Sequence, residues 1–175
     1  MQGGEITVKS KLDEGTTFFF TLKFKKAGKE IIDKKESLHS KKHVLYEELR
    51  NKNVLLLEDN PVNQFLAKVV MGKWGCSVDV AENGRIGLEK LKKKEYDVIL
   101  MDLQMPEMDG YEATNNIRNV LLKKGVPIIA MTAHAIKGES EKCIEAGMND
   151  YISKPFDPEI LYSKMKAQIF KDKVS

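Results

Sequence analysis

From residue 53 onward, short apolar runs alternate with longer amphipathic segments. Five runs of four to six residues have the composition of strands that are buried on both faces. They are VLLL (54–57), SVDVA (77–81), DVILMD (97–102), PIIAMT (127–132) and DYISK (150–154). Strands that alternate with helices through right-handed crossovers form a parallel sheet with helices on both sides. We therefore predict an α/β fold with a doubly wound five-stranded parallel sheet in the order 2-1-3-4-5.

Helix signals fill the gaps between these runs. The first helix is expected to begin at Asn60 and Pro61, because proline suits the first helical turn, and to end near Gly75. Helical spacing predicts that its buried face is formed by Val62, Leu66, Val69, Val70 and Trp74. The other helices are expected to start near Gly84, to cover 113–121 and 139–146, and to begin at Pro158.

The first 52 residues have a different composition. ITVKS and TTFFFTLKF are rich in β-branched and aromatic residues, and the turn signal KLDEG separates them, which predicts a β-hairpin within residues 1–26. A hairpin alone is only marginally stable, so it needs a surface to pack on. Residues 27–52 are rich in lysine and read as a linker, with a short helix near 44–50 that carries Leu45 and Leu49. The α/β domain then occupies residues 53–173.

Polar residues stand at the carboxyl ends of four predicted strands. Glu58 and Asp59 follow the first strand, Asp102 ends the third, Thr132 ends the fourth and Lys154 ends the fifth. In a doubly wound sheet these ends share one edge, and ligands bind there. Each residue alone would be interpreted as a cap or turn residue, but four strands that bring polar residues to one edge indicate a site.

The three acids at this edge require a cation. Two carboxylates ~4 Å apart repel by ~4 kcal/mol at an effective dielectric constant of about 20, and Lys154 supplies only one positive charge. The candidate ligands are all oxygens, which favours Mg²⁺ or Mn²⁺ over zinc, held by Glu58 and Asp59. Because Mg²⁺ also binds phosphate oxygens, we expect phosphoryl transfer, with Asp102 on the central strand as the nucleophile. Lys154 and the Thr132 hydroxyl would stabilise the transferred group.

The composition of the chain restricts its partners and its location in the cell. The 175-residue chain has a formal net charge of +3, and its lysines alternate with acids, which argues against a nucleic-acid partner. It has neither a signal peptide nor an apolar run near the ~20 residues that span a bilayer, so we expect a cytoplasmic chain without membrane insertion. Cys76 and Cys143 lack the spacing of metal ligands and are expected to be reduced.

Four segments together resemble the response-regulator receiver domain of two-component signalling, whose sheet is flavodoxin-like. They are LLLEDN, VILMDLQMPEMDGYEAT, IIAMTAHA and DYISKPF, and the resemblance covers residues 53–171. It implies that Asp102 is the phosphorylated residue. It also implies that Mg²⁺ is bound by Asp59, by Asp102, by the backbone carbonyl of Gln104 and, through water, by Glu58.

The resemblance further implies a donor and a switch. The donor would be a phosphohistidine on a histidine kinase dimerisation domain or on a histidine phosphotransfer protein, and Thr132 and Lys154 would contact the transferred group. Thr132 would then move inward and the ring of Tyr151 would follow. Gln104 and His134 would influence how fast water removes the phosphate. A monomer and a dimer are both compatible with the sequence.

The first segment resembles the end of the ATP-binding domain of histidine kinases, through GGEITVKSKLDEGTTFFFTLKF. The nucleotide-binding asparagine and glycine boxes of that domain are missing from the sequence, as is the dimerisation helix with its histidine. We therefore expect no ATP-dependent kinase activity, and we interpret the chain as the C-terminal part of a hybrid histidine kinase. A parent kinase that is anchored in a membrane is compatible with the sequence.

Three other functions are alternatives to this interpretation. An aspartate-based phosphatase of the α/β type usually carries a second aspartate two residues after the nucleophile, where this chain has Gln104. An interaction module that uses the receiver fold without phosphorylation would not need the complete set of site residues. A flavodoxin-like cofactor binder would need a Ser/Thr/Gly-rich phosphate loop after the first strand, and none is present there.

Overall fold

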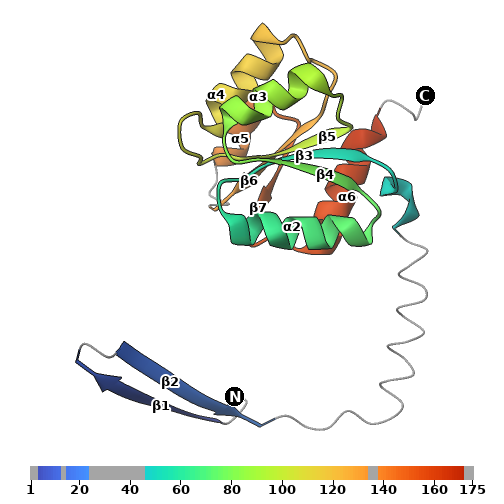
Figure 1. Ribbon diagram of the computed structural model, residues 1–175. Helices are drawn as coiled ribbons and strands as arrows, with labels where there is room; N and C mark the ends of the chain where they lie inside the picture. Colours follow the sequence, from blue (N-terminus) through green and yellow to red (C-terminus); the bar gives the residue numbers. More distant parts are fainter. Residues whose placement is uncertain (1–3, 13–14, 24–45, 134–137, 172–175) are drawn as a thin grey trace. The chain divides into compact units, whose positions relative to one another are not determined.

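The computed structural model describes residues 4–12, 15–23, 46–133 and 138–171 of the chain. The chain divides into two compact units, Met1–His43 and Val44–Ser175. The first unit holds a β-hairpin and the second holds an α/β domain (Figure 1). Among the described helices, none is both long enough and apolar enough to cross a membrane.

The first unit contains the predicted hairpin, formed by β1 (Gly4–Lys11) and β2 (Gly15–Leu22). The strands are antiparallel, with Ile6 opposite Phe20 and Val8 opposite Phe18. Because side chains alternate along a strand, these four apolar residues share one face of the hairpin. All four are exposed, Phe20 by 70%, so the described residues leave this face uncovered.

The second unit is built on a five-stranded parallel sheet. Its strands are β3 (Asn53–Leu57), β4 (Ser77–Ala81), β5 (Val98–Asp102), β6 (Ile128–Thr132) and β7 (Asp150–Ser153). Neighbouring strands are all parallel, in the order β4-β3-β5-β6-β7. This arrangement confirms the predicted order 2-1-3-4-5 and makes β5 the central strand.

The α-helices of the described domain follow the predicted positions. They are α2 (Pro61–Lys73), α3 (Gly84–Lys93), α4 (Gly110–Asn115), α5 (Glu139–Glu145) and α6 (Pro158–Ile169). The start of α2 is fixed by Asn60, whose side chain accepts a hydrogen bond from the Val62 N–H at 2.9 Å, and by proline at the first helical position. α4 continues directly into a π-helix, η2 (Asn116–Val120), which the apolar pattern did not predict.

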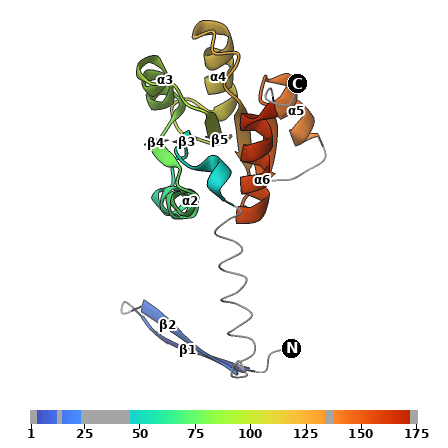
Figure 2. The same cartoon turned by 90° about the vertical axis from the view of Figure 1, so that its right-hand side faces the viewer.

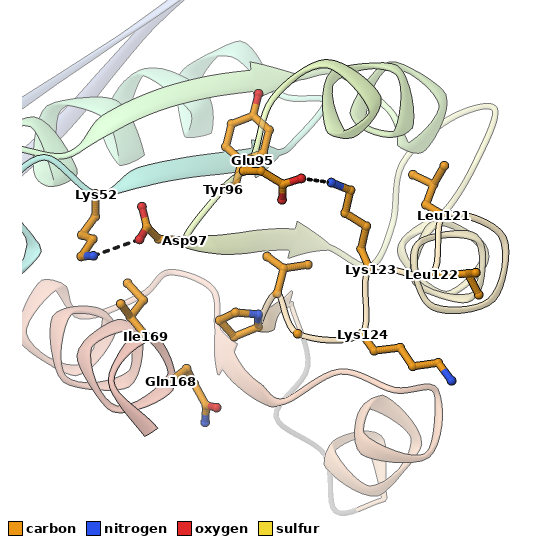
Figure 3. Close-up of a pocket in the computed structure, with 13 residues that line it drawn as sticks. Lys52, Glu95, Tyr96, Asp97, Leu121, Leu122, Lys123, Lys124, Gln168 and Ile169 are labelled. Carbon is orange, nitrogen blue, oxygen red and sulfur yellow. Dashed lines mark hydrogen bonds and ion pairs between the residues drawn. The ribbon is translucent and has the colours of Figure 1, made fainter. Parts of the chain in front are cut away.

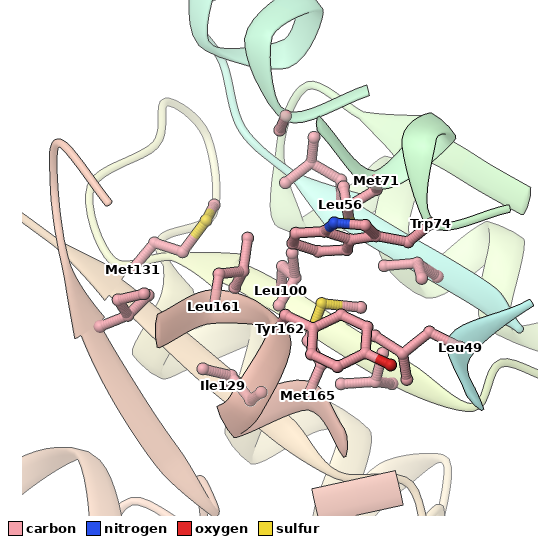
Figure 4. Packing of buried hydrophobic residues seen from close by; sticks show 14 residues of the cluster. Leu49, Leu56, Met71, Trp74, Leu100, Ile129, Met131, Leu161, Tyr162 and Met165 are labelled. Atoms are coloured by element: carbon pink, nitrogen blue, oxygen red, sulfur yellow. The ribbon is translucent and has the colours of Figure 1, made fainter. Parts of the chain in front are cut away.

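Alternate residues along the inner strands face two separate hydrophobic cores, so the sheet is covered by helices on both sides (Figure 2). Leu56, Leu100 and Ile129 belong to the core that α2 and α6 cover (Figure 4). Leu55 and Ile99 belong to the core that α3 and α4 cover. All five side chains are fully buried, which explains why these strands have continuous apolar sequences.

The orientation of α2 differs from the prediction. Val62 and Leu66, which were expected to be buried, are 72% and 51% exposed, and Val69 is exposed as well. Ala67 and Met71 are buried instead. The other two residues of the predicted face do pack against the core: Val70 and Trp74. The helix carries two apolar stripes, and helical periodicity alone does not determine which stripe faces the sheet.

The second unit begins earlier than the predicted boundary at residue 53. A 3₁₀-helix, η1 (Glu47–Leu49), places Leu49 in the core under α2 and α6, where it is fully buried. The ring centroids of Tyr46 and Tyr162 lie 4.7 Å apart in an edge-to-face arrangement. Residues 46–52 of the predicted linker therefore belong to the α/β unit, whereas Leu45 and most of that linker lie outside the described residues.

Candidate acidic site at the carboxyl edge of the sheet

The carboxyl edge of the sheet brings together the polar residues that were predicted there. Glu58 and Asp59 follow β3, Asp102 is the last residue of β5, Thr132 is the last residue of β6, and Lys154 follows β7. All five line one pocket of about 440 Å³. The three acids can each place a carboxylate oxygen within 4.8 Å of the others. The strand-end interpretation of the sequence is confirmed as far as the position of these residues is concerned.

Lys154 bridges two buried acids of the pocket. Its Nζ donates hydrogen bonds to Glu58 Oε2 and to Asp102 Oδ2, both at 2.6 Å. Glu58 and Asp102 are only 2% and 7% exposed, whereas Asp59 is exposed. The backbone N–H of Lys154 donates to the Thr132 carbonyl oxygen at 2.7 Å, so the lysine is also fixed to the end of β6.

Burial and charge shift the pKa values of this ion pair. Burial raises the pKa of Asp102, and the nearby Glu58 charge adds to the increase; hydrogen bonds from Lys154 and from the Gln104 N–H only partly oppose it. Burial opposes the charged form of Lys154, but its hydrogen bonds to the two carboxylates prevail, and the pKa of Lys154 is raised. Two buried carboxyl groups thus share one ammonium group, and the third acid of the cluster, Asp59, has no ion pair with it.

The excess of acidic groups and the all-oxygen set of donors fit a small divalent cation. Glu58, Asp59 and Asp102 form the acidic cluster, and the exposed Asp59 leaves one side of it open to solvent. Mg²⁺ is usually bound through one or two carboxylates and keeps several waters, which suits an open cluster of this kind. Gln104, whose carbonyl was the fourth predicted ligand, lines the same pocket.

Two further side chains belong to the site although the strand-end pattern did not predict them. Asn63, in the first turn of α2, donates from Nδ2 to Glu58 Oε1 at 3.0 Å. Glu139, the first residue of α5, accepts a hydrogen bond from Thr132 Oγ1 at 3.0 Å. Both lie on helices and not at strand ends. A signal existed for Asn63, because it falls in the turn that the Asn60–Pro61 pair predicts, but none singled out Glu139 from the other acids around it.

The predicted switch and tuning residues are placed only in part. Tyr151 pairs with Ala130 in the ladder between β6 and β7, and it is 36% exposed. The ammonium group of Lys164 lies 5.2 Å from the centroid of the Tyr151 ring. Gln104 is exposed in the pocket, and His134 lies outside the described residues.

A second and larger pocket, of about 590 Å³, lies at the opposite edge of the sheet, beside the residues that precede β3, β5 and β6 (Figure 3). Lys52 pairs there with Asp97 at 2.9 Å, and Lys123 pairs with Glu95. These charges are neutralised in pairs, in contrast to the acids at the carboxyl edge. Charge distribution, and not pocket size, therefore identifies the carboxyl edge as the candidate site.

A parallel sheet with an acidic site outside its carboxyl ends places the chain among the doubly wound α/β proteins. A family model for the response regulator receiver domain matches residues 54–166. The chain belongs to this receiver family. The resemblance to the receiver domain and the predicted fold class are thereby confirmed.

Relatives in the same family are sensor kinases and receiver domains. The autoinducer 2 sensor kinase/phosphatase LuxQ of Vibrio vulnificus (strain YJ016) is 38% identical over 165 residues, which cover 94% of this chain and 19% of LuxQ. The receiver domain of the sensor histidine kinase PA1611 from Pseudomonas aeruginosa PAO1 is 40% identical with a TM-score of 0.63, covering 68% of this chain and 98% of that domain. In that crystal structure a magnesium ion is coordinated in the active site cleft.

A third relative comes from a complex. A chain from the co-crystal structure of the histidine phosphotransfer protein Ypd1 with the receiver domain of Ssk1, from Saccharomyces cerevisiae, is 31% identical with a TM-score of 0.64. The alignment covers 69% of this chain and 90% of that one. The chain spans between 7% and 20% of the length of the curated sensor kinases that it matches.

Proposed function

We propose that Asp102 accepts a phosphoryl group from a phosphohistidine. The observation that carries this proposal is the position of Asp102: it ends the central strand and lies in the acidic cluster, with the Lys154 ammonium at 2.6 Å. An Asp102 carboxylate oxygen attacks the phosphorus atom, the phosphorus–nitrogen bond breaks, and the leaving histidine nitrogen takes up a proton. The product is an acyl phosphate on Asp102.

The neighbouring residues stabilise and orient the transferred group. The Lys154 ammonium neutralises phosphoryl charge, and the Thr132 hydroxyl donates a hydrogen bond to a phosphoryl oxygen. Glu58, Asp59, Asp102 and the Gln104 carbonyl would hold Mg²⁺, which, when bound, supplies the positive charge that the acids lack. Tyr151 follows Thr132 in the switch, and Gln104 with His134 sets the rate at which water reaches the phosphate.

Incubation with Mg²⁺ and acetyl phosphate tests the proposal. We expect mass spectrometry to find one hydroxylamine-sensitive phosphoryl group per chain, and we expect Asp102→Asn to lose it. Glu107→Gln, which alters an exposed acid in the segment after β5, should keep it. An unmodified wild-type chain, or a modified Asp102→Asn chain, would contradict the assignment. Turnover of many phosphate esters would instead favour the aspartate-based phosphatase.

We further propose that the phosphohistidine-bearing partner packs on α2. Val62, Phe65, Leu66 and Val69 are 72%, 69%, 51% and 40% exposed, which is unusual for four large apolar side chains on one short helix. The same helix begins beside the acidic site, because Asn63 binds Glu58. A helical partner, either a kinase dimerisation domain or a histidine phosphotransfer protein, would cover this stripe while its histidine faces Asp102. The Ypd1 complex supports this class of partner.

The N-terminal hairpin indicates the kind of larger protein to which this receiver domain belongs. The LuxQ alignment covers 94% of the chain, more than the receiver domain alone would account for. We propose that residues 1–26 are the last strands of a histidine kinase ATP-binding domain, whose remaining part covers the apolar face of Ile6, Val8, Phe18 and Phe20. The receiver then works in the cytoplasm as part of a hybrid histidine kinase.

A further inference from the structure

Glu139 occupies a position in the site that the proposed chemistry does not use. It is the first residue of α5, and its Oε2 accepts a hydrogen bond from Thr132 Oγ1 at 3.0 Å. It lines the same pocket as Asp102 and Lys154 and is half-buried there. Thr132 itself is 4% exposed, so its hydroxyl is held inside the pocket wall.

The hydrogen bond between Thr132 and Glu139 conflicts with phosphorylation for two reasons. A hydroxyl group has a single proton and donates one hydrogen bond at a time, so Thr132 cannot donate to Glu139 and to a phosphoryl oxygen together. Glu139 also adds another acid to a pocket that already contains Glu58, Asp59 and Asp102. Like charges raise the free energy of a dianionic phosphoryl group in such a site.

We infer that Glu139 is a positioning residue that holds the Thr132 hydroxyl in its resting orientation and opposes occupation of the phosphoryl site. In the resting chain Thr132 donates to Glu139; in the phosphorylated chain it donates to the phosphoryl group, and Glu139 is released. The release breaks this hydrogen bond between the end of β6 and the first turn of α5, which couples the site to that helix. This inference rests on the proposed phosphorylation of Asp102.

Beryllofluoride, which mimics a phosphoryl group on a carboxylate, measures the effect of Glu139 without any turnover. Removal of the Glu139 carboxylate, which competes for the Thr132 hydroxyl, shifts the population toward chains with beryllofluoride bound at Asp102. In the presence of Mg²⁺, we expect isothermal titration calorimetry to show that Glu139→Ala binds beryllofluoride about three- to tenfold more tightly than the wild type. Glu139→Gln keeps a hydrogen-bond acceptor but loses the charge. Its affinity for beryllofluoride should lie between those of the wild type and Glu139→Ala.

The chain offers a matched control on the same helical turn. Glu141 is exposed and accepts its hydrogen bond from Ser140, outside the pocket. Glu141→Ala removes the same charge from the same end of α5, so it reproduces any general effect on the helix. We expect its affinity for beryllofluoride to equal that of the wild type, and circular dichroism should confirm that all variants are folded.

A double-mutant cycle shows whether Glu139 acts through Thr132. Thr132→Val removes the hydroxyl at nearly constant volume, so in that background Glu139→Ala should give a clearly smaller gain in affinity, because only the charge repulsion is left to relieve. An equal gain in both backgrounds would overturn the inference, because Glu139 would then act by charge alone. The inference would also be overturned if Glu139→Ala did not raise the affinity for beryllofluoride in the chain that keeps Thr132. A wild-type chain that does not bind beryllofluoride would overturn both this inference and the proposed function.

Discussion

Asp102 is the residue at which stability and chemistry conflict most directly. Its carboxyl group is buried beside Glu58, and its pKa is raised. In the pH range between the ordinary pKa and the raised one, the folded chain keeps a proton that the unfolded chain releases. The free energy of unfolding therefore falls as the pH rises through that range, and the ionised form at neutral pH carries a penalty.

Asp102→Asn should remove this penalty. In EDTA at pH 7, we expect urea denaturation to show a free energy of unfolding higher than that of the wild type by on the order of 1 kcal/mol. Lys154 keeps Glu58 as its partner in this variant, so no unpaired ammonium is created. Added Mg²⁺ should narrow the difference, because the cation stabilises the wild-type cluster. A less stable Asp102→Asn chain in EDTA would contradict the argument.

Cys76 shows the effect of burial on a residue outside the site. Cys76 and Cys143 are free thiols, as predicted, and burial raises the pKa of Cys76 to about 11. Its Sγ donates to the Leu49 carbonyl oxygen at 3.4 Å. Because the thiolate is the nucleophile, we expect alkylation of Cys76 by iodoacetamide in a Cys143→Ser chain to accelerate by about tenfold per pH unit from pH 7 to 10. A plateau near pH 9 would show that the thiol is not shifted.

At the scale of elements, a substitution in the exposed stripe of α2 should affect the binding of the partner and leave the phosphorylation chemistry of Asp102 unchanged. Leu66→Ser should leave acetyl phosphate labelling and the free energy of unfolding nearly unchanged, because this side chain is half exposed and lies away from the carboxylates. Transfer from a phosphorylated histidine phosphotransfer protein that labels the wild-type chain should slow by about tenfold or more. Rapid-quench measurement of the transfer rate checks this.

A matched apolar residue on another helix serves as the control for the α2 stripe. Ile160, on α6, is 52% exposed, like Leu66. Ile160→Ser removes a side chain of the same size from a surface that the docking proposal does not use. We expect it to accept the phosphoryl group at the wild-type rate. Equal loss in both variants would show that α2 is not the specific docking surface.

The elements also show what the sequence could and could not predict. The strands were predictable because burial on both faces requires runs such as VLLL and VILMD, which few other structures need. The orientation of α2 was not, because Val62 and Leu66 form an apolar stripe as regular as the buried one. The π-helix over Asn116–Val120 was not predictable either, because no local pattern in the sequence marks it.

The residues of the candidate site also fall into those that the sequence could predict and those that it could not. Glu58, Asp102, Thr132 and Lys154 could be found because the topology of a parallel sheet alone brings strand ends to one edge. Glu139 reaches Thr132 from the start of a helix, so its contact depends on how α5 is placed against β6. The sequence therefore predicts residues positioned by the sheet, and it misses those positioned by packing between layers.

At the scale of the whole molecule, the boundary of the α/β unit decides which piece folds by itself. Leu49 is fully buried, and the rings of Tyr46 and Tyr162 are in contact. Lys166 on α6 also pairs with Glu48 at 2.6 Å, although this exposed pair adds little. The residues just before β3 thus close the core that α2 and α6 cover, so we expect the receiver to need them although the family model begins at residue 54.

Two truncated chains test this boundary. A chain that starts at residue 44 should unfold in one transition and keep beryllofluoride binding, because it retains Tyr46 and Leu49. A chain that starts at residue 53 should be less stable by about 2–5 kcal/mol, since the loss of Leu49 opens a cavity among Trp74, Tyr162 and their neighbours. Urea denaturation of both fragments, beside Leu49→Ala in the full chain, measures the difference. If the shorter fragment were as stable as the longer one, residues 46–52 would be a linker after all, and the packing of Leu49 would contribute nothing to the free energy of folding.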